Sequence, residues 1–353
     1  MAVSGTRPGL QTQVLSAGTP EETRTAVAAA VDILRRGEVV ALPTETVYGL
    51  AADALDAGAC AKVFEAKERP RFDPLIVHVS GREMLDEVAV VPAELSAVID
   101  RLAGEFWPGP LTFVLPRKLT VPDIVTAGLA TVAVRSSKHP VFKAVVKELG
   151  RPLAAPSANR FGSISPTSAS AVMAELSGRI PLLVDGGACS EGVESTIVRL
   201  EATDRPKPLI HLLRPGPVTV EMLKKFGKVA TAPRLSPQDG QPEVPGQLPS
   251  HYAPRTPLRL LAKPEDFSPE PGKRYALLSY RGLSKDGYVD LHDWDEVQVL
   301  SPGSGKLPEA AVRFFFVLRA LDACGVDEIV SEPFPERGVG LAIQDRLRRA
   351  AVE

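Results

Sequence analysis

Short apolar runs alternate with segments of helical periodicity along the first 230 residues. Residues 39–42 form a continuous apolar run that predicts a buried strand, and Pro43 ends it because proline cannot donate a ladder hydrogen bond. Thr-Pro-Glu-Glu at residues 19–22 is a capping box that predicts the start of a helix, and Gly37 predicts its end. By the same criteria we expect strands at 75–79, 111–115, 131–135, 152–155, 182–185, 195–200 and 209–213, and helices at 57–67, 92–103, 140–149, 167–177 and 218–226.

This alternation predicts an α/β protein in which helices pack on a sheet of mixed strand direction. The pattern stops at residues 231–257, whose seven prolines and two glycines predict a semi-extended linker. Beyond the linker a second, smaller α/β pattern follows, so we predict a flexible tail at 1–18, a larger domain at 19–230 and a smaller domain at 258–353. In the smaller domain we expect strands near 258–261, 274–280, 297–300 and 327–331, and helices near 307–323 and 339–351.

The composition excludes several classes of protein. The chain has no apolar run of 18 residues, so no membrane span is predicted, and its first 18 residues do not follow the pattern of a signal peptide. Its three cysteines are odd in number, lie far apart and form no Cys-x-x-Cys pair, which argues against a zinc site or a disulfide framework and for a reducing cytoplasm. A net charge of −2 argues against nonspecific nucleic-acid binding as the main activity.

Polar side chains crowd the end of the first predicted strand. Thr44, Glu45, Thr46 and Tyr48 follow Pro43 directly, and Gly49 comes next. Open α/β sheets bind ligands at the carboxyl ends of their strands, so this turn is a candidate binding site.

Basic side chains end other predicted elements. Lys67, Arg69 and Arg71 close a helix, where basic residues are common on a solvated surface. Arg135 and Arg214 each follow a buried strand and lead into a turn, which is better explained by a shared anion than by chance.

Small and hydroxyl-bearing residues form a further candidate group. Ser157 and Asn159 lie in a run of alanines that lets a ligand approach the backbone. Ser165 precedes a proline and is expected to cap the next helix, whose free backbone N–H groups suit a phosphate. His78 lies in a predicted strand, and it becomes a candidate only if the turn at Thr44 is its neighbour.

No familiar nucleophile or metal motif accompanies these groups. The sequence has no Gly-x-Ser-x-Gly elbow, no His-Glu-x-x-His and no cysteine beside a histidine. The Ser-Pro-Gly-Ser-Gly-Lys segment at 301–306 does not have the spacing of a phosphate loop and is interpreted as a surface loop. Arginines, lysine, hydroxyls and an asparagine bind anions and position them, so the chemistry predicted here is the joining of two substrates while a polyphosphate is neutralised.

Taken together, these segments resemble the YrdC-like threonylcarbamoyl-adenylate synthases, in the long form with an additional C-terminal domain. The resemblance covers about residues 20–255 in collinear blocks. The matching blocks are Pro-Thr-Glu-Thr-Val-Tyr-Gly-Leu at 43–50, Lys-Glu-Arg at 67–69, Pro-Leu-Ile-Val-His at 74–78, Trp-Pro-Gly-Pro-Leu-Thr at 107–112, Thr-Val-Ala-Val-Arg at 131–135, Ser-Ala-Asn at 157–159, Gly-Val-Glu-Ser-Thr at 192–196, Arg-Pro-Gly-Pro at 214–217 and Ser-His-Tyr-Ala-Pro at 250–254.

The resemblance implies a YrdC-like twisted, mixed open sheet with flanking helices, plus a smaller Rossmann-like C-terminal domain. It implies that L-threonine, bicarbonate and ATP give threonylcarbamoyl-AMP and pyrophosphate, for N6-threonylcarbamoyladenosine formation in tRNAs that read ANN codons. The residues expected to bind L-threonine are Thr44, His78, Arg135, Ser157 and Ser195, with Arg135 on the carboxylate. The residues expected to bind ATP are Lys67, Arg69, Arg71, Thr131, Asn159, Ser165, Arg214 and Tyr252.

Further expectations follow from the resemblance. Mg²⁺ is expected to arrive with ATP rather than on protein side chains, and no general base is assigned. The linker at 231–257 is expected to cover the active site, with Tyr252 as a lid. The expected partners are proteins that transfer the threonylcarbamoyl group to tRNA, with weak binding of tRNA itself.

Two other interpretations compete with this one. The hydrogenase-maturation carbamoyltransferases share this fold, but they carry zinc-finger cysteines and an acylphosphatase module that this chain has no room for. The second is a double-stranded RNA-binding or regulatory protein of the same fold, against which the overall acidity argues.

Overall fold

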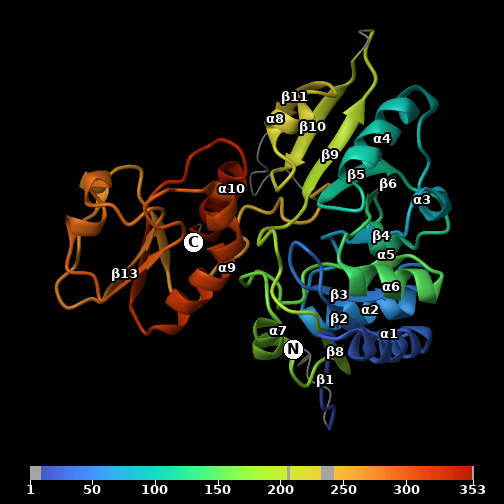
Figure 1. The fold of residues 1–353 in the computed structure, drawn as a ribbon, viewed down its shortest axis with the longest axis horizontal. Helices are drawn as coiled ribbons and strands as arrows, with labels where there is room; N and C mark the ends of the chain where they lie inside the picture. The colour runs from blue at the N-terminus through green and yellow to red at the C-terminus, as the bar shows by residue number, and fades with distance from the viewer. Residues whose placement is uncertain (1–8, 205–206, 232–241, 352–353) are drawn as a thin grey trace.

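The computed structural model describes residues 9–204, 207–231 and 242–351, and within them the strands form two sheets. The larger is an eleven-stranded mixed sheet in the order β1-β8-β2-β3-β7-β4-β6-β5-β9-β10-β11 (Figure 1). Its strands are β1 (Gln13–Ser16), β2 (Val40–Leu42), β3 (Gly49–Asp53), β4 (Ile76–His78), β5 (Leu111–Pro116), β6 (Thr131–Arg135), β7 (Leu153–Ala154), β8 (Leu182–Asp185), β9 (Thr196–Glu201), β10 (Leu209–Arg214) and β11 (Lys228–Thr231).

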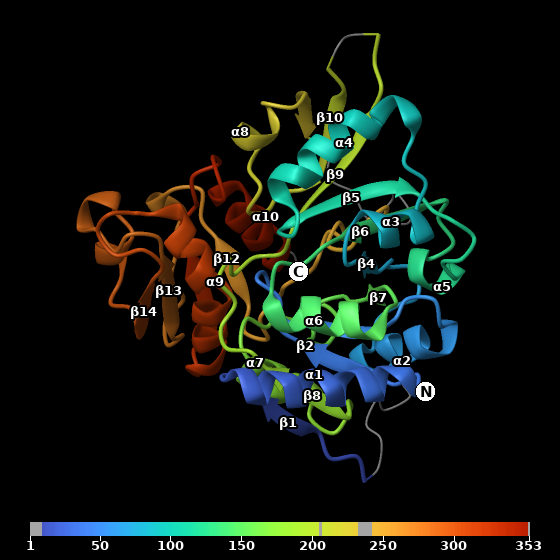
Figure 2. The same ribbon diagram turned by 45° about the vertical axis from the view of Figure 1, so that its right-hand side comes forward.

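Helices cover this sheet and bury its apolar residues. One large core cluster joins apolar side chains of the first and sixth helices to those of β2, β4, β5 and β6. In both views the first, second and sixth helices lie side by side, next to β2 and β3 (Figures 1 and 2). The helices of this unit are α1 (Pro20–Arg35), α2 (Ala57–Lys67), α3 (Arg82–Val88), α4 (Ala93–Phe106), α5 (Asp123–Thr126), α6 (Pro140–Leu149), α7 (Ala169–Leu176) and α8 (Val220–Leu223).

Strand register brings the candidate residues to one edge of the sheet. β4 and β6 are parallel neighbours in which His78 pairs with Arg135, and Arg135 pairs on its other side with Thr112 of β5. β5 runs parallel to β9, where Leu111 is opposite Thr196. The ends of three neighbouring strands therefore place His78, Arg135 and the start of β9 together.

The second sheet is parallel and has the order β12-β15-β13-β14, with β12 (Leu258–Leu260), β13 (Tyr275–Ser279), β14 (Glu296–Val299) and β15 (Glu328–Ser331). Two helices, α9 (Leu307–Ala323) and α10 (Gly340–Ala350), lie between this sheet and the larger unit in both views (Figures 1 and 2). Three short 3₁₀ turns complete the unit: η1 (Pro264–Asp266), η2 (Ser284–Asp286) and η3 (Val289–Leu291).

The predicted fold class is confirmed: a mixed open α/β sheet with a separate parallel C-terminal sheet. Part of the predicted tail is wrong, because residues 13–16 form β1, whose backbone pairs with β8. Residues 1–8 of that tail and residues 232–241 of the predicted linker lie outside the described residues. The other domain bounds stay predictions.

The helix cap expected at Ser165 is also wrong. α7 begins at Ala169, and the hydroxyl of Ser168 accepts a hydrogen bond from Ala171 N instead. The segment from Ser163 to Thr167 runs without helix, and the Ser165 hydroxyl donates to the carboxylate of Glu194. The side chain thus serves a long-range contact rather than the local cap.

Gly192 lies in close contact with the backbone of α9. A Cβ placed on Gly192 would collide with the backbone of Ala311 and Val312, and its φ is +74°. Gly187 has a similar φ of +84°, but a Cβ added there would meet nothing within 4 Å. Gly192→Ala should therefore lower the free energy of unfolding by about 1–3 kcal/mol more than Gly187→Ala, since both add backbone strain but only one adds a clash. Scanning calorimetry of the two variants checks this, and equal losses would contradict the tight contact.

Candidate active site

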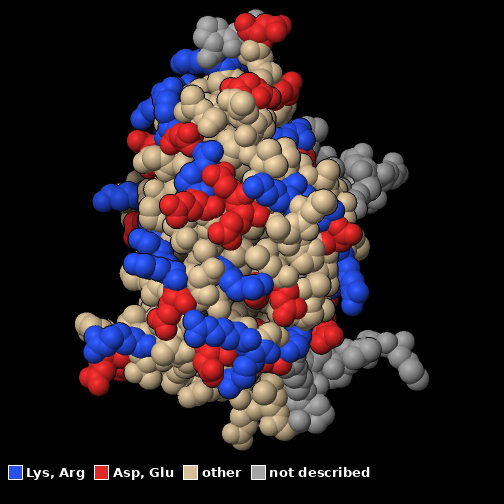
Figure 3. Space-filling model, turned by 90° about the vertical axis from the view of Figure 1, so that its right-hand side faces the viewer, with Lys and Arg blue, Asp and Glu red and all other residues tan. Residues whose placement is uncertain are grey.

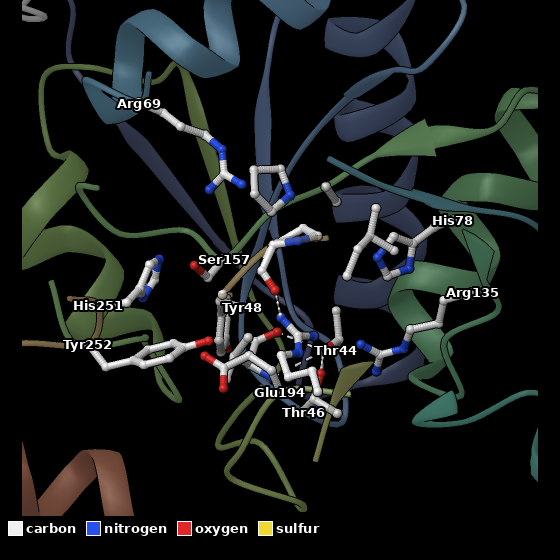
Figure 4. A pocket seen from close by; sticks show the side chains of 18 residues that line it. Thr44, Thr46, Tyr48, Arg69, His78, Arg135, Ser157, Glu194, His251 and Tyr252 are labelled. Atoms are coloured by element: carbon white, nitrogen blue, oxygen red, sulfur yellow. Dashed lines mark hydrogen bonds between the residues drawn. The ribbon is translucent and has the colours of Figure 1, made fainter. Parts of the chain in front are cut away.

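A narrow cavity lies at the edge of the sheet, under the segment that joins the two units. Its internal volume is about 40 Å³, which has room for little more than water. The lining residues come from the turn after β2, the ends of β4, β6 and β10, the segments that follow α2 and β7, the loop before β9, and residues 245–252 (Figure 4).

The turn after β2 is fixed by its own hydroxyl groups. The Thr44 hydroxyl accepts hydrogen bonds from Thr46 N at 3.0 Å and Val47 N at 3.2 Å, and it donates to Val47 O at 2.6 Å. The Tyr48 hydroxyl donates to Gly187 O at 2.7 Å, which ties the turn to the loop after β8. This bracing makes Thr44 part of a preformed wall of the cavity.

Arg135 lies buried beside Glu45. Its Nη2 atom is 2.8 Å from Glu45 Oε1, yet neither of these atoms has a partner with hydrogen-bond geometry. Burial raises the pKa of Glu45, but Arg135 and the hydroxyl of Ser137 outweigh it and lower this pKa to about 2. Glu45 is therefore ionised, and Arg135 keeps hydrogen-bonding capacity toward the cavity.

His78 is neutral in this setting. The pKa of His78 is lowered to about 3, mainly because the side chain is buried and secondly because of the positive charge of Arg135. Its ring packs on Phe142 with centroids 4.6 Å apart, and its Nδ1 atom has no hydrogen-bond partner. The imidazole offers the cavity a neutral donor or acceptor rather than a positive charge.

A second group of cations surrounds the opposite wall. Arg69 is held by Asp73 at 2.9 Å, and Arg214 donates to Ser195 O at 3.1 Å, to Ser195 Oγ at 3.0 Å and to Pro245 O at 3.1 Å. The Lys67 ammonium donates to the carbonyl oxygens of Ser157 and Asn159, both at 2.5 Å. Burial, together with the charge of Arg69, lowers the pKa of Lys67 well below its usual value.

Comparisons with known proteins agree with this geometry. Residues 32–216 match a family model described as "Telomere recombination", and residues 218–352 match one described as "Threonylcarbamoyl-AMP synthase, C-terminal domain". The chain is 39% identical to the threonylcarbamoyl-AMP synthase of Pyrococcus abyssi, with 91% of this chain and 93% of that protein covered. It is 41% identical to the one of Bacillus subtilis, with 92% of each covered. The chain belongs to the threonylcarbamoyl-AMP synthase family.

Solved structures of the family superpose along nearly the whole chain. A crystal structure of P. abyssi Sua5 complexed with L-threonine has a TM-score of 0.82 at 35% identity, covering 96% of this chain and 98% of that one. A second structure of the same protein, a variant with one histidine and one tyrosine replaced by alanine, has a TM-score of 0.83 at 36% identity, covering 96% of each chain. The resemblance inferred from sequence is confirmed for both domains.

Most of the predicted site residues gather in one place. The predicted residues that line the cavity are Arg214 and, labelled in Figure 4, Thr44, Arg69, His78, Arg135, Ser157 and Tyr252. Lys67 and Ser195 lie directly behind this lining, through their hydrogen bonds to Ser157 and Arg214.

Four predicted residues lie apart from the lining. The Asn159 amide donates to two neighbouring carbonyl groups at 2.8 Å, and the Ser165 hydroxyl donates to Glu194 at 2.5 Å. Arg71 is exposed, and Thr131 begins β6 at the opposite end from Arg135. Their roles as nucleotide ligands stay predictions.

Other lining residues were given no ligand from the sequence. Thr46 and Tyr48 lie in the turn identified above as a candidate binding site. Glu194 and His251 belong to motifs quoted above, and their place in those motifs was the available signal. Glu194 is the least expected, because its carboxylate lines a cavity rich in arginine.

The described residues bring together no group of three or more His, Cys, Asp or Glu side chains that could hold a metal ion. No helix within the described ranges is long and apolar enough to cross a membrane.

The buried neutral histidine has a measurable effect on stability. Between pH 6.5 and about 3 the unfolded chain binds a proton at His78 that the folded chain does not, so acidification lowers the free energy of unfolding. Between pH 6 and 4, His78→Asn should reduce the pH dependence of the free energy of unfolding by up to about 1.4 kcal/mol per pH unit. Denaturant unfolding at several pH values measures it. Phe142→Leu is the companion variant: it loosens the packing that buries His78 but keeps the titrating group, so it should reduce the pH dependence less than His78→Asn does.

Proposed function

We propose that the chain is an L-threonylcarbamoyladenylate synthase, which makes threonylcarbamoyl-AMP and pyrophosphate from L-threonine, bicarbonate and ATP. One observation carries the proposal: Arg69, Arg135 and Arg214, which are far apart in the sequence, converge on one cavity. Two anionic substrates, an amino acid and a nucleotide, call for separate arginines within one site.

The threonine end of the site is proposed to lie at Arg135. Its Nη2 atom has no partner of hydrogen-bond geometry, so it can donate to the substrate carboxylate. Thr44 and the neutral His78 offer hydroxyl and imidazole contacts, while Ile76 and Ala155 give an apolar surface for the substrate methyl group. Ser157 and Ser195 complete the set, toward the nucleotide.

The nucleotide end is proposed to lie toward Arg69, Arg214 and Tyr252, which line the other wall. Lys67 stands behind Ser157 and adds a further group that can turn toward a phosphate. The remaining residues of this assignment are Arg71, Thr131, Asn159 and Ser165.

The proposed reaction relies on positioning and charge neutralisation. The threonine amine attacks bicarbonate and a carbamate forms with loss of water; a carbamate oxygen then attacks the α-phosphorus, and pyrophosphate leaves. Two anions have to meet in this step, so arginines that lower their mutual repulsion and hold them in line lower the barrier. No side chain is assigned as a general base.

Three further parts of the proposal concern the surroundings of the enzyme. Mg²⁺ is proposed to enter as a complex with ATP, since the described residues contain no cluster of three or more His, Cys, Asp or Glu side chains that could bind it. The product is proposed to pass to proteins that transfer the threonylcarbamoyl group to tRNAs reading ANN codons. A cytoplasmic location fits the three cysteines, none of which forms a disulfide.

The RNA-binding alternative has less support. On the face drawn in Figure 3, lysine and arginine side chains are interleaved with aspartate and glutamate, so this face has no continuous basic surface for a phosphate backbone. Salt-sensitive RNA binding without release of pyrophosphate would favour that alternative.

The deciding experiment is incubation of the purified chain with ATP, bicarbonate and one amino acid at a time. Pyrophosphate release and a threonylcarbamoyl-AMP mass are expected with threonine, and serine should be used about 10–200-fold less well because it lacks one methyl group. Arg135→Lys should raise the KM for threonine more than the KM for ATP. Absence of the adenylate with every amino acid would refute the proposed function.

Tyr252 is proposed to act as a lid over the nucleotide. Its side chain is buried, its φ is +64°, and its ring lies 4.1 Å from the ring of His251 and 5.8 Å from that of Phe315, between centroids. Residues 245, 246, 251 and 252 line the cavity, so we expect this segment to move when a nucleotide enters. Tyr252→Ala should therefore lower the yield of adenylate per ATP consumed, through loss of the hydrolysable intermediate. Tyr252→Phe, which keeps the ring, should retain most of the yield; an unchanged yield and ATP affinity in Tyr252→Ala would count against the lid.

A further inference from the structure

The C-terminal domain reaches the wall of the cavity through one buried arginine. Arg346 of α10 is fully buried, and its Nε atom is 3.0 Å from Glu194 Oε2. Its Nη1 atom donates to Pro215 O at 2.8 Å, and its guanidinium carbon lies 5.4 Å from the centre of the Tyr252 ring. Arg346 therefore touches three segments of the larger unit's active-site region from the other domain.

The charges around the cavity explain why such a contact is needed. Three carboxylates lie at or just behind its wall, and each has its own arginine: Glu45 has Arg135 at 2.8 Å, Asp73 has Arg69 at 2.9 Å, and Glu194 has Arg346. The first two pairs are made within the larger unit. Of these three carboxylates, only that of Glu194 depends on a residue of the C-terminal domain.

Of these three carboxylates, Glu194 is the one that lines the cavity itself. It lines the cavity beside Arg214 and Tyr252, in the part assigned above to the nucleotide. In a site of low dielectric constant an unpaired carboxylate would repel a polyphosphate strongly. A neutralised Glu194 leaves the charge of Arg214 available for the ligand.

We propose that Arg346 is a positioning residue that neutralises Glu194 and supports Tyr252, so that the nucleotide site is complete only when the C-terminal domain is docked. The inference rests on the proposed function and assigns part of its ATP binding to the second domain. Arg346 acts through Glu194 and Tyr252 rather than on the reacting atoms.

The neighbours of Arg346 fit this role. Its own helix supplies Asp345, whose Oδ2 atom is 3.1 Å from Arg346 Nη1, but Asp345 is shared with Arg349, which binds it through Nε at 3.1 Å and Nη2 at 3.2 Å. Arg349 also donates to the carbonyl oxygens of Gln247 at 2.8 Å and Leu248 at 2.6 Å, in the segment that covers the cavity. The Nη2 atom of Arg346 has no hydrogen-bond partner although it is buried, so one donor of this guanidinium remains for a ligand or a water molecule.

The test separates charge neutralisation from a merely structural contact. The full chain is compared with Arg346→Met, Arg346→Lys, Glu194→Gln and the double variant Arg346→Met/Glu194→Gln, by KM for ATP and for threonine, by kcat, and by equilibrium dialysis of ATP. Arg346→Met should raise the KM for ATP at least tenfold and the KM for threonine much less. The double variant should recover most of the ATP affinity, because the repelling charge is gone, and Arg346→Lys should fall between Arg346→Met and the unchanged chain.

Arg348→Ala is the matched control. Arg348 lies on the same helix, is partly exposed and pairs with Glu336, away from the cavity. The KM and kcat values of the Arg348→Ala variant should therefore equal those of the unchanged chain. Thermal unfolding of each variant shows whether the chain is folded. If Arg346→Met fails to fold, Glu194→Gln and Arg346→Lys carry the test: the first should bind ATP at least as well as the unchanged chain, and the second less well.

Two results would overturn the inference: an Arg346→Met variant with unchanged ATP affinity, or a double variant that binds ATP no better than Arg346→Met. Failure of the proposed function is distinguishable from both. In that case the unchanged chain makes no adenylate with any amino acid, whereas ATP dialysis still reports on Arg346 and Glu194.

Discussion

The cost of burying positive charge is the constraint on which the site depends. Arg69, Arg135, Arg214 and Arg346 are all less than a tenth exposed, and a guanidinium that leaves water needs a carboxylate or carbonyl oxygen in its place. Each one has such partners, but their donors are incompletely used, above all at Arg135 and Arg346. The fold thus holds several cations out of water while leaving donors for an anionic ligand.

The sheet supplies the precision that this arrangement needs. His78 and Arg135 are register partners on parallel strands, and Thr112 of the next strand shares a 2.8 Å hydrogen bond with Ser195, which in turn accepts from Arg214. A chain of contacts therefore runs along the strand ends from one arginine to the other. Because hydrogen-bonded backbone fixes their spacing, Arg135 and Arg214 are held at a set distance from each other, which suits the proposed reaction between two bound substrates.

Much of this was predictable from local sequence. Arg135 and Arg214 were identified because each follows a buried strand, and the C-terminal strands and helices were located to within a residue or two because their apolar periodicity is strong. The errors were contacts that local pattern does not encode. Ser165 resembles a helix cap, yet its hydroxyl bonds Glu194, 29 residues away, and Glu194 binds Arg346, 152 residues away. Proline content identified the linker, but it does not tell where a linker packs. Strands β1, β3 and β11 were not predicted. β1 and β11 are short and mostly exposed, and β3 consists mainly of glycine and alanine, which have little strand propensity.

Residues 242–252 are fastened at several points rather than laid loosely over the site. Arg214 donates to Pro245 O, Arg349 donates to Gln247 O and Leu248 O, and His251 N donates to Arg349 O. This segment is bound to both domains, so it can move away from the cavity only by breaking hydrogen bonds to arginine side chains. Each 1.4 kcal/mol that these hydrogen bonds add to the barrier slows this movement by about tenfold. If this segment opens as proposed for Tyr252, the strength of these few hydrogen bonds determines the rate of ligand exchange. Substitutions in the second domain can then change that rate without altering a residue that contacts the substrate.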